Sequence, residues 1–455
     1  MNHPALLRLA EATRGSEYEN KIFLVGGCVR DELLGLEPKT DFDLVITGDA
    51  VALADWIWEQ GLSSIPPVTY PRFGTAMVQI EGFPVELVTA RRENYLEESR
   101  KPIVEPASLD EDAKRRDFTI NTLLRNLHSG QLIDPLGVAV SDLSARILAA
   151  PDDPVKLFSD DPLRMLRAVR FRWQLDLTPG RGLYEAVWAE RERLKIISAE
   201  RIRDEWSKML TLPNQKAVGA MRDLLKLGLL EQFLPEFMPM VGLFQGGFHH
   251  LDVWEHTLLV VESLPETSPD KLVLVLAALF HDVSKPETRS YEGGKIRFFA
   301  HEVVGAKRTT EILSRLKFPG ETIEAVTNLV KNHMRLATFH ELSKPATRRL
   351  IRDTDGLTYL LLDLVEADCA ALKPGSKTLD LNPIREAIET VMIETPPSQL
   401  VSPLNGEEIM ALTGLPPGKA VGEIKVMLTE MVIEGELGFE DKSKATEIVL
   451  AKQSH

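Results

Sequence analysis

The hydrophobic periodicity of this chain changes near Asp160, and this change constrains the fold more than any other feature. Before it, residues 21–90 contain short β-rich runs: KIFLVGG ends in a glycine pair, DFDLVIT follows, and TAMVQIEGFPVELVTA has the pattern of two strands joined at Glu81-Gly82. Residues 49–61 between these runs have the spacing of an amphipathic helix. After Asp160 the apolar residues repeat with helical spacing to the end of the chain. The sequence therefore predicts an α/β head followed by a long all-α body.

Prolines and glycines divide the helical part into modules. Breakers occur at Pro151–Pro154, Pro235–Gly247 and Pro374-Gly375. A length of 455 residues also indicates several domains, at about 150 residues each. We predict four regions: a head at 1–150, a helical neck at 151–245, a body at 246–375 and a helical tail at 376–455.

Composition excludes several classes of protein. The chain is 44% hydrophobic and 27% charged, which excludes a largely disordered protein. The longest apolar run, Leu272–Phe280, is far shorter than the roughly 20 residues of a membrane span, so it predicts a buried helix. The N-terminus lacks the pattern of a signal peptide, and Cys28 and Cys369 do not form a CxxC pair. We expect a cytoplasmic protein without a membrane partner.

The net charge limits how such a chain can bind nucleic acid. It carries 53 Lys and Arg against 68 Asp and Glu, a formal net charge of −15. This argues against a non-specific nucleic-acid coat, which is basic throughout. An acidic enzyme that acts on RNA would need its positive charge concentrated locally, because the rest of its surface repels a polyanion.

The head carries carboxylates in a pattern typical of metal-dependent phosphate chemistry. Gly26-Gly27 ends a strand and precedes a helix, so backbone N–H groups there can approach a phosphate. Asp41 and Asp43 alternate along the next strand and therefore face the same way. Two carboxylates on one face repel unless a cation lies between them, which predicts a Mg²⁺ site. The alternative is that Asp41 and Asp43 are solvated acids on an edge strand. Glu86 on a later strand is a candidate third carboxylate, or simply an exposed strand residue.

A second polar group precedes the apolar run at the end of the head. KRRDFTINTLL places Arg116, Asp117 and Asn121 close together. Arginine suits triphosphate oxygens through its planar set of donors, and an Asp and an Asn can hold ribose hydroxyls. A helix N-cap at Asp117, flanked by solvated charges, is the alternative interpretation.

These motifs together resemble a known family. In order along the chain they are GGCVRD (26–31), DFD (41–43), RFGTA (72–76), ARRENY (90–95), RRDFTIN (115–121), DDPLRMLRAVRF (160–171) and ERIRDE (200–205). This series resembles the class II tRNA nucleotidyltransferases, the CCA-adding enzymes, whose near relatives are the bacterial poly(A) polymerases. The resemblance implies an α+β fold in which a polymerase-β-like nucleotidyltransferase head precedes an all-α neck, body and tail. It implies that tRNA, ATP and CTP are the partners.

The resemblance also assigns roles to residues. Asp41 and Asp43 are expected to hold catalytic Mg²⁺, with Glu86 beside them. The polar segment Arg91–Asp112 resembles the family's flexible loop. The expected nucleotide-binding residues are Gly26, Gly27, Arg30, Arg116, Asp117, Asn121, Asp161, Arg164, Arg167 and Arg170.

Selection of C and A without a template can be explained from the neck. Asp161 and Arg164 lie three apart near the predicted start of a helix, so we expect their side chains to be adjacent. A carboxylate beside a guanidinium matches the donor and acceptor edges of cytosine and of adenine, and guanine and uracil reverse that pattern. This pair resembles the family's base-reading motif, normally Glu-Asp-x-x-Arg, here with Asp160 first. Arg167 and Arg170 extend a row that we expect to supply local positive charge for RNA phosphates.

The body carries histidines and aspartates in a second motif. Their order resembles the HD phosphohydrolase superfamily, in which an adjacent His-Asp pair anchors a divalent metal. The candidate ligands are His256, His281, Asp282, His301, His333 and Asp368. Imidazole and carboxylate ligands suit Mn²⁺, Ni²⁺ or Mg²⁺ better than structural zinc, and metal-bound water is a nucleophile at neutral pH. Lys285 is placed to hold a phosphate. A retained fold that only supports tRNA is the alternative.

Several functions remain open at the level of sequence. The leading hypothesis is CCA addition to tRNA with an appended HD phosphohydrolase. The alternatives are a poly(A) polymerase, a partial enzyme that adds only CC or only A, and an HD phosphohydrolase whose head merely binds a nucleotide. The ARRENY segment and the loop after it argue against the CC-only enzyme. The segment 402–428 resembles the tail of bacterial members, where PPGKAVGEI predicts a turn before a helix and a contact to RNA phosphate. The oligomeric state stays open.

Overall fold

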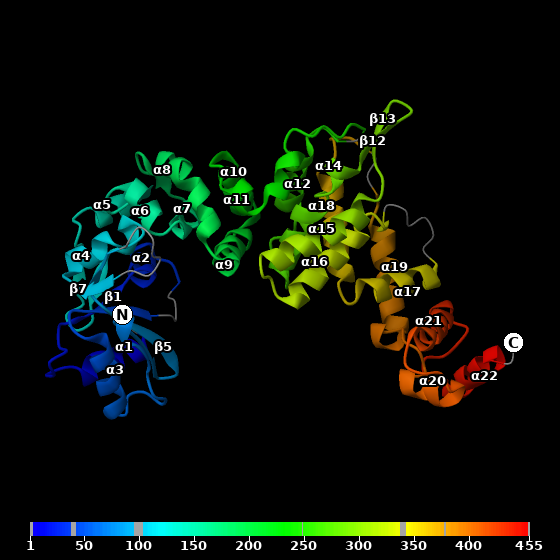
Figure 1. The fold of residues 1–455 in the computed structure, drawn as a ribbon, viewed down its shortest axis with the longest axis horizontal. Coiled ribbons are helices and arrows are strands. Elements are labelled where there is room, and N and C mark those ends of the chain that lie inside the picture. Colours follow the sequence, from blue (N-terminus) through cyan, green and yellow to red (C-terminus); the bar gives the residue numbers. More distant parts are fainter. Residues whose placement is uncertain are drawn as a thin grey trace. The chain divides into compact units, whose positions relative to one another are not determined.

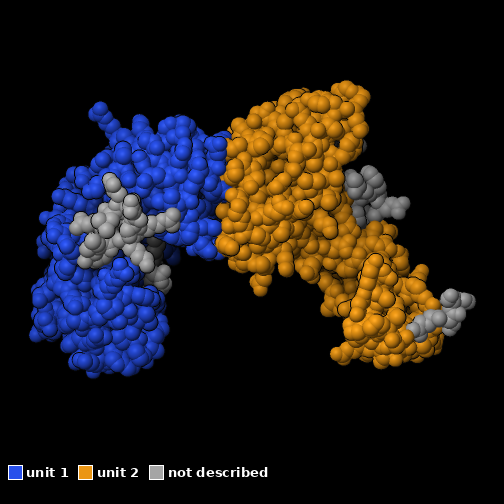
Figure 2. All heavy atoms as spheres, viewed as in Figure 1, with its two compact units in different colours: residues 1–209, 219–233 blue, residues 210–218, 234–455 orange. Residues whose placement is uncertain are grey.

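The computed structural model describes residues 3–37, 42–94, 103–247, 249–336, 343–376 and 379–453. The chain forms two compact units (Figure 2). Unit 1 contains residues 1–209 and 219–233, and unit 2 contains residues 210–218 and 234–455.

Unit 1 begins with a seven-stranded sheet in the order β3-β4-β5-β2-β1-β8-β9. In this sheet β2 and β5 run parallel, and the other neighbours are antiparallel. The strands are β1 (Ile22–Val25), β2 (Phe42–Ile46), β3 (Val68–Tyr70), β4 (Thr75–Ile80), β5 (Phe83–Thr89), β8 (Leu124–Asn126) and β9 (Leu132–Ile133). The helices of the head are α1 (Pro4–Ala12), α2 (Gly27–Leu33), α3 (Ala50–Glu59), α4 (Leu109–Lys114) and α5 (Ala139–Ser144), with short 3₁₀ turns η1 (Pro71–Phe73) and η2 (Thr119–Asn121).

Local chemistry explains why these elements form. The β4–β5 hairpin turns at Glu81 and Gly82, both with positive φ (52° and 81°), which matches the right-handed twist of the strands. The helix α3 is capped by Asp49, whose carboxylate accepts from two N–H groups of the first turn. The strands and the helix predicted for the head are thus confirmed.

Two smaller pairs of strands complete unit 1. They are β6 (Arg91–Asn94) with β7 (Ile103–Pro106), and β10 (Ile147–Leu148) with β11 (Thr178–Pro179). The expectation of a poorly patterned loop over Arg91–Asp112 is therefore wrong for its described part, which forms β6, β7 and most of α4. A capping box at Ser108 and Glu111 explains why α4 begins there.

The neck is helical, as predicted (Figure 1). Its elements are α6 (Pro154–Asp160), α7 (Leu163–Gln174), α8 (Leu183–Glu190), η3 (Arg191–Ile196), α9 (Ala199–Leu210), α10 (Asn214–Lys226) and α11 (Leu230–Phe233). The apolar stripe of α7, which includes Leu166 and Val169, is fully buried.

The predicted start of the neck helix is wrong in detail. Asp160 is the last residue of α6, and Asp161 has an extended backbone between α6 and α7. The residue before a proline is disfavoured in helical conformation, so Pro162 separates the two helices. The Asp161 carboxylate still accepts from the Leu163 N–H at 3.2 Å and so caps α7.

The body of unit 2 packs around one apolar helix. α13 (Lys271–Phe280) is buried from Leu274 onward and lies against α12 (Val253–Ser263), α16 (Gly320–Asn332) and α18 (Thr358–Ala370). This confirms the buried helix predicted from the apolar run. The other elements are η4 (Pro235–Met240), α14 (Lys285–Thr288), β12 (Arg289–Glu292), β13 (Lys295–Phe298), α15 (His301–Arg315) and α17 (Lys344–Thr354). Among the described helices, none has the length and apolarity needed to cross a membrane.

The tail continues as helices with a small core of their own. They are α19 (Asn382–Glu394), α20 (Gly406–Thr413), α21 (Lys419–Glu434) and α22 (Lys442–Gln453), with a turn η6 (Pro397–Gln399). Leu428 of α21 packs with Ile409 of α20 and Val449 of α22. Arg349 of α17 donates to Glu430 of α21 at 3.0 Å, which ties the tail to the body. The predicted turn before α21 is present at Gly418.

Candidate functional site

Two carboxylates of the head lie opposite each other on neighbouring strands. Asp43 of β2 and Glu86 of β5 are register partners in the parallel pair. Burial and the negative charge of Asp43 raise the pKa of Glu86 above its usual range. Two acids held this close favour a cation between them, so the pair fits a divalent metal. Asp41, predicted to complete the site, lies outside the described residues.

The glycine turn of the head is formed as predicted. Gly26 has φ 73°, a conformation that glycine adopts without strain, and α2 begins at the next residue, Gly27.

Arg30 of α2 is buried against side chains of the head and of α7. Its side chain is 2% exposed, pairs with Asp31, and donates from Nη1 to Asn121 Oδ1 at 2.6 Å. Its guanidinium also lies 5.1 Å from the ring centre of Phe171. Burial and these partners make Arg30 a support for Asn121 in this arrangement, and its contact to a nucleotide stays a prediction.

Asp117 joins the head to the neck helix α7. Its Oδ1 accepts from Asn121 Nδ2 at 3.0 Å, and its Oδ2 pairs with Arg167 Nη2 at 2.6 Å. Burial alone would raise the pKa of Asp117, but the Arg167 guanidinium and the hydrogen bonds lower it to about 2. Asp117, Asn121 and Arg167, predicted as a nucleotide-binding group, are thus brought together, and Asp117 is not a simple helix cap.

The row of arginines on α7 is not an open ridge of positive charge. Arg170 is 8% exposed and its Nε lies 2.6 Å from Glu205 Oε2 of α9. Arg167 also approaches the same carboxylate, at 3.5 Å. The expectation that these side chains receive RNA phosphates from solvent is wrong for Arg170, because a buried carboxylate neutralises it. Sequence reasoning quoted ERIRDE but gave Glu205 no role.

Arg116 is held by an acid that the sequence analysis did not single out. Asp112 at the end of α4 is 1% exposed and pairs with Arg115 at 2.7 Å and with Arg116 at 2.9 Å. Its position four residues before Arg116 on a helix is the signal that was available.

Asp161 and Arg164, the predicted base-reading pair, have separate partners. Asp161 Oδ2 pairs with Arg201 at 3.0 Å. Arg164 Nη2 donates to the carbonyl of Arg115 at 2.7 Å and lines an open pocket with Lys114. The expected side-by-side contact is therefore absent from the interactions of the described residues, because the carboxylate and the guanidinium each face another group.

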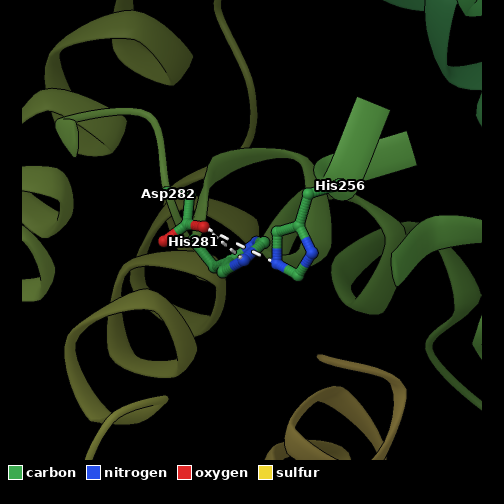
Figure 3. A group of neighbouring side chains, drawn as sticks. All are labelled: His256, His281 and Asp282. Atoms are coloured by element: carbon green, nitrogen blue, oxygen red, sulfur yellow. Dashed lines mark ion pairs between the residues drawn. The ribbon is translucent and has the colours of Figure 1, made fainter. Parts of the chain in front are cut away.

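The body brings its six predicted metal ligands together. His256 Nε2 lies 3.0 Å from Asp368 Oδ1 and 3.8 Å from Asp282 Oδ2, and His281 Nε2 lies 3.1 Å from that same Asp282 oxygen. Figure 3 shows His256, His281 and Asp282 converging from α12 and from the end of α13. Except for Asp368, whose side chain is 25% exposed, the groups are nearly inaccessible.

A second group shares Asp282. His301 Nε2 lies 3.4 Å from Asp282 Oδ1 and 3.2 Å from His333 Nε2. Either group has three ligand atoms close enough to bind one ion. A bridging carboxylate between two such groups suits one or two divalent cations.

Backbone carbonyls orient three of these imidazoles. The Nδ1 atoms of His281, His301 and His333 each donate to a carbonyl three residues earlier, at 2.7–2.8 Å. Their Nε2 atoms therefore face the centre of the cluster. Burial and the neighbouring His281 lower the pKa of His333 to about 3, so that ring is neutral. The Nε2 atoms of His301 and His333, 3.2 Å apart, form a hydrogen bond when one of them carries a proton, and without that proton both can ligate one cation, so the residues fit a metal.

Three further side chains line the cluster. Lys285 Nζ lies 2.6 Å from Asp282 Oδ2 and donates to Gln245 Oε1 at 2.6 Å. The His249 ring lies 4.7 Å from that of His256, and burial together with Lys285 lowers the pKa of His249 to about 4. Gln245 and His249 were missed by sequence reasoning. In the sequence, these two residues were marked only by their position beside the glycine pair Gly246-Gly247.

Comparison with known proteins agrees with this layout. Residues 22–149 match the family described as the poly A polymerase head domain, residues 180–240 the probable RNA and SrmB-binding site of polymerase A, and residues 247–360 the HD domain. A solved CCA-adding enzyme of Bacillus stearothermophilus, in complex with CTP, has the same fold: its TM-score is 0.65 at 22% identity, covering 99% of this chain and 98% of that one.

Two curated relatives match over almost their whole length. An A-adding tRNA nucleotidyltransferase of Deinococcus radiodurans is 36% identical, covering 93% of this chain and 94% of that protein. A CC-adding tRNA nucleotidyltransferase of Thermus thermophilus is 34% identical, covering 93% and 92%. With a nucleotidyltransferase head, a helical neck and an HD domain in this order, the chain belongs to the tRNA nucleotidyltransferases.

Proposed function

We propose that this chain adds CCA to the 3′ end of tRNA from CTP and ATP without a nucleic-acid template. The observation that carries the proposal is the pairing of Asp43 with Glu86 across β2 and β5, where the pKa of Glu86 is raised by its neighbour. Mg²⁺ held there by Asp43, and by Asp41 as the sequence predicts, would neutralise developing charge on the phosphates. The site residues and the four-domain division predicted from the sequence are part of this proposal.

Different residues near the metal site bind different parts of the nucleotide. Arg116 presents its guanidinium to the triphosphate while Asp112 holds it in place. Asn121, supported by Arg30 and by Asp117, is positioned for the ribose. Arg167 anchors Asp117 to α7, so that the sugar-binding and base-binding elements move as one.

Base selection requires one change in the contacts of the neck. Arg164 must exchange the carbonyl of Arg115 for the base acceptor, and Asp161 must exchange Arg201 for the base amine. Because both present contacts are single hydrogen bonds or ion pairs at least partly open to solvent, their replacement by base contacts costs little.

The test is a direct product analysis. The purified chain is incubated with tRNA that lacks its 3′ end, with Mg²⁺, CTP and ATP, and the added nucleotides are sequenced. Addition of C, C and A in that order supports the proposal, and the absence of any addition contradicts it.

Addition of A alone is the second candidate. It is favoured by the Deinococcus relative, which is A-adding and matches over almost the whole length. In the same assay such an enzyme leaves tRNA without CC unchanged and adds one A to tRNA that ends in CC. Long A tails on an RNA unrelated to tRNA would instead indicate a poly(A) polymerase.

For the body, we propose a metal-dependent phosphohydrolase. The supporting observation is that the Nε2 atoms of His301 and His333 lie together beside Asp282, close enough to hold one ion. A metal such as Mn²⁺, Ni²⁺ or Mg²⁺ would supply an activated water there. Hydrolysis of a 2′,3′-cyclic or terminal phosphate by the metal-loaded chain, lost on chelation, supports this. No hydrolysis with any of the three metals supports a body that only holds tRNA.

A further inference from the structure

The hairpin β12–β13 lies directly beside the metal cluster of the body. The carbonyl of Phe298, at the end of β13, accepts from Nδ1 of the ligand His301 at 2.8 Å. The Nζ of Lys285 lies 5.5 Å from the Phe298 ring centre and 2.6 Å from Asp282 Oδ2. A molecule bound on this hairpin is therefore close to the groups that would hold a phosphate.

Two aromatic side chains are exposed on this side of the hairpin. Tyr291 is 68% exposed and Phe244 is 58% exposed. Tyr291 is the register partner of Ile296, so both project from the same face of the hairpin. A Cβ at Gly246 would lie 3.9 Å from Ile296 Cδ1 and from Phe244 Cε1, which places Phe244 next to that face. Exposed aromatic rings that lie next to one another form an interaction surface.

Positive charge gathers on the same hairpin. The Arg289 guanidinium lies 5.1 Å from the ring centre of Tyr291, and its buried Nε has no hydrogen-bond partner among the described residues. Lys295 and Arg297 of β13 are exposed on the opposite face, so the cations beside Tyr291 and Phe298 are Arg289 and Lys285. In a chain with a net charge of −15, two cations on one face favour an anionic ligand.

Proteins commonly stack nucleobases on aromatic rings, because every base has a flat π-face. A guanidinium beside the rings adds a cation–π contact and attracts the phosphate of the nucleotide. We propose that Phe244 and Tyr291, with Arg289, bind the base of a nucleotide whose phosphate reaches Lys285 and the metal cluster. These side chains then determine specificity: they select phosphate esters that carry a base. The inference rests on the proposed phosphohydrolase function of the body.

The experiment compares two phosphomonoesters that differ in the base, 2′-AMP and glycerol 2-phosphate, on the full chain loaded with Mn²⁺. Tyr291→Ala and Phe244→Ala are each expected to raise KM for 2′-AMP about tenfold while kcat stays within about threefold. KM for glycerol 2-phosphate should not change. Tyr291→Phe keeps the stacking ring and removes only the hydroxyl to which Arg289 Nη2 donates, so KM should stay within about threefold of wild type. Tyr359→Ala, at the exposed start of α18, is the matched control and should change neither substrate.

The outcomes separate this inference from the function on which it rests. Equal effects on both substrates, or no effect on 2′-AMP, overturn base stacking while the hydrolase stands. If the wild-type chain hydrolyses neither substrate, the hydrolase proposal fails, and calorimetric binding of the two compounds decides the stacking claim. A preference for 2′-AMP that is lost in Tyr291→Ala then supports it, and equal binding of the two compounds overturns it.

Discussion

Asp117 shows how one buried carboxylate connects two parts of unit 1. It accepts from Asn121 in the head and pairs with Arg167 in α7, and it is 9% exposed. Because the folded pKa is depressed to about 2, the ionised form stabilises the native state above the unfolded pKa near 4, and that stability is lost as the pH falls toward 2. At neutral pH the shift corresponds to about 2 kcal/mol.

Asp117→Asn should therefore lower the opening free energy of residues 163–174 by about 2 kcal/mol at pH 7, measured by hydrogen exchange. The difference from wild type should fall to about half by pH 3, because the unfolded aspartate is by then mostly protonated. Asp204→Asn, an exposed acid on α9, is the control and should change opening by less than about 0.5 kcal/mol. A difference that does not depend on pH would mean that packing, rather than charge, explains the effect.

Base choice also belongs to single residues. Asp161→Ala or Arg164→Ala should weaken discrimination against UTP and GTP by roughly tenfold to a hundredfold, the value of one charge-assisted hydrogen bond. Affinity for the triphosphate should change less. The measurement is kcat/KM for each of the four nucleotides, with Arg193→Ala as an exposed arginine of the neck for comparison. Unchanged preference in both variants would leave Asp161 as a cap of α7 and Arg164 as a structural contact.

At the scale of elements, ion pairs connect α7 both to the head and to α9. Its Arg167 reaches the head through Asp117, and its Arg170 reaches α9 through Glu205. Two arginines of the row therefore fix α7 between two neighbours, and the predicted contact to RNA phosphates stays a prediction for the others.

Glu205→Gln should destabilise this arrangement by about 3 kcal/mol, because it leaves the buried Arg170 without its counter-charge. Thermal unfolding together with hydrogen exchange of α7 and α9 measures the effect. The matched change Glu200→Gln, exposed on the same helix, should be nearly neutral. Equal stability of the two variants would show that the ion pair contributes nothing net.

Elements were predictable where a local signal defined them. The hairpin turn at Glu81-Gly82 and the buried helix ending at Phe280 followed from turn chemistry and from an unbroken apolar run. The neck helix was expected to start near Asp161, and the structure starts it at Leu163, because Pro162 keeps Asp161 out of the helical conformation.

At the scale of the whole molecule, the sequence motifs identified most of the chemical groups and few of their partners. All six predicted ligands of the body meet in space, because the order of a motif records residues that converge on one centre. Asp112 was missed although its spacing to Arg116 was a signal. Glu205 was missed because a buried counter-ion for an arginine has no spacing rule across 35 residues of chain, as between Arg170 and Glu205. The same limit hid Gln245, which contacts Lys285 from 40 residues away.

The two proposed chemistries occupy different units of the chain. Asp43 and Glu86 belong to unit 1, and the six ligands of the body belong to unit 2. Since each site has its own ligands and its own fold, changes in one should leave the other intact.

The most direct measurement assays both activities on one set of variants. Asp43→Ala is expected to abolish nucleotide addition to tRNA, with hydrolysis of 2′,3′-cyclic AMP by the Mn²⁺-loaded chain unchanged. His281→Ala is expected to abolish hydrolysis and Mn²⁺ binding, with the rate of nucleotide addition within about twofold of wild type. Near-normal nucleotide addition by Asp43→Ala with Mg²⁺ would contradict the assignment of Asp43 as a ligand of the catalytic metal.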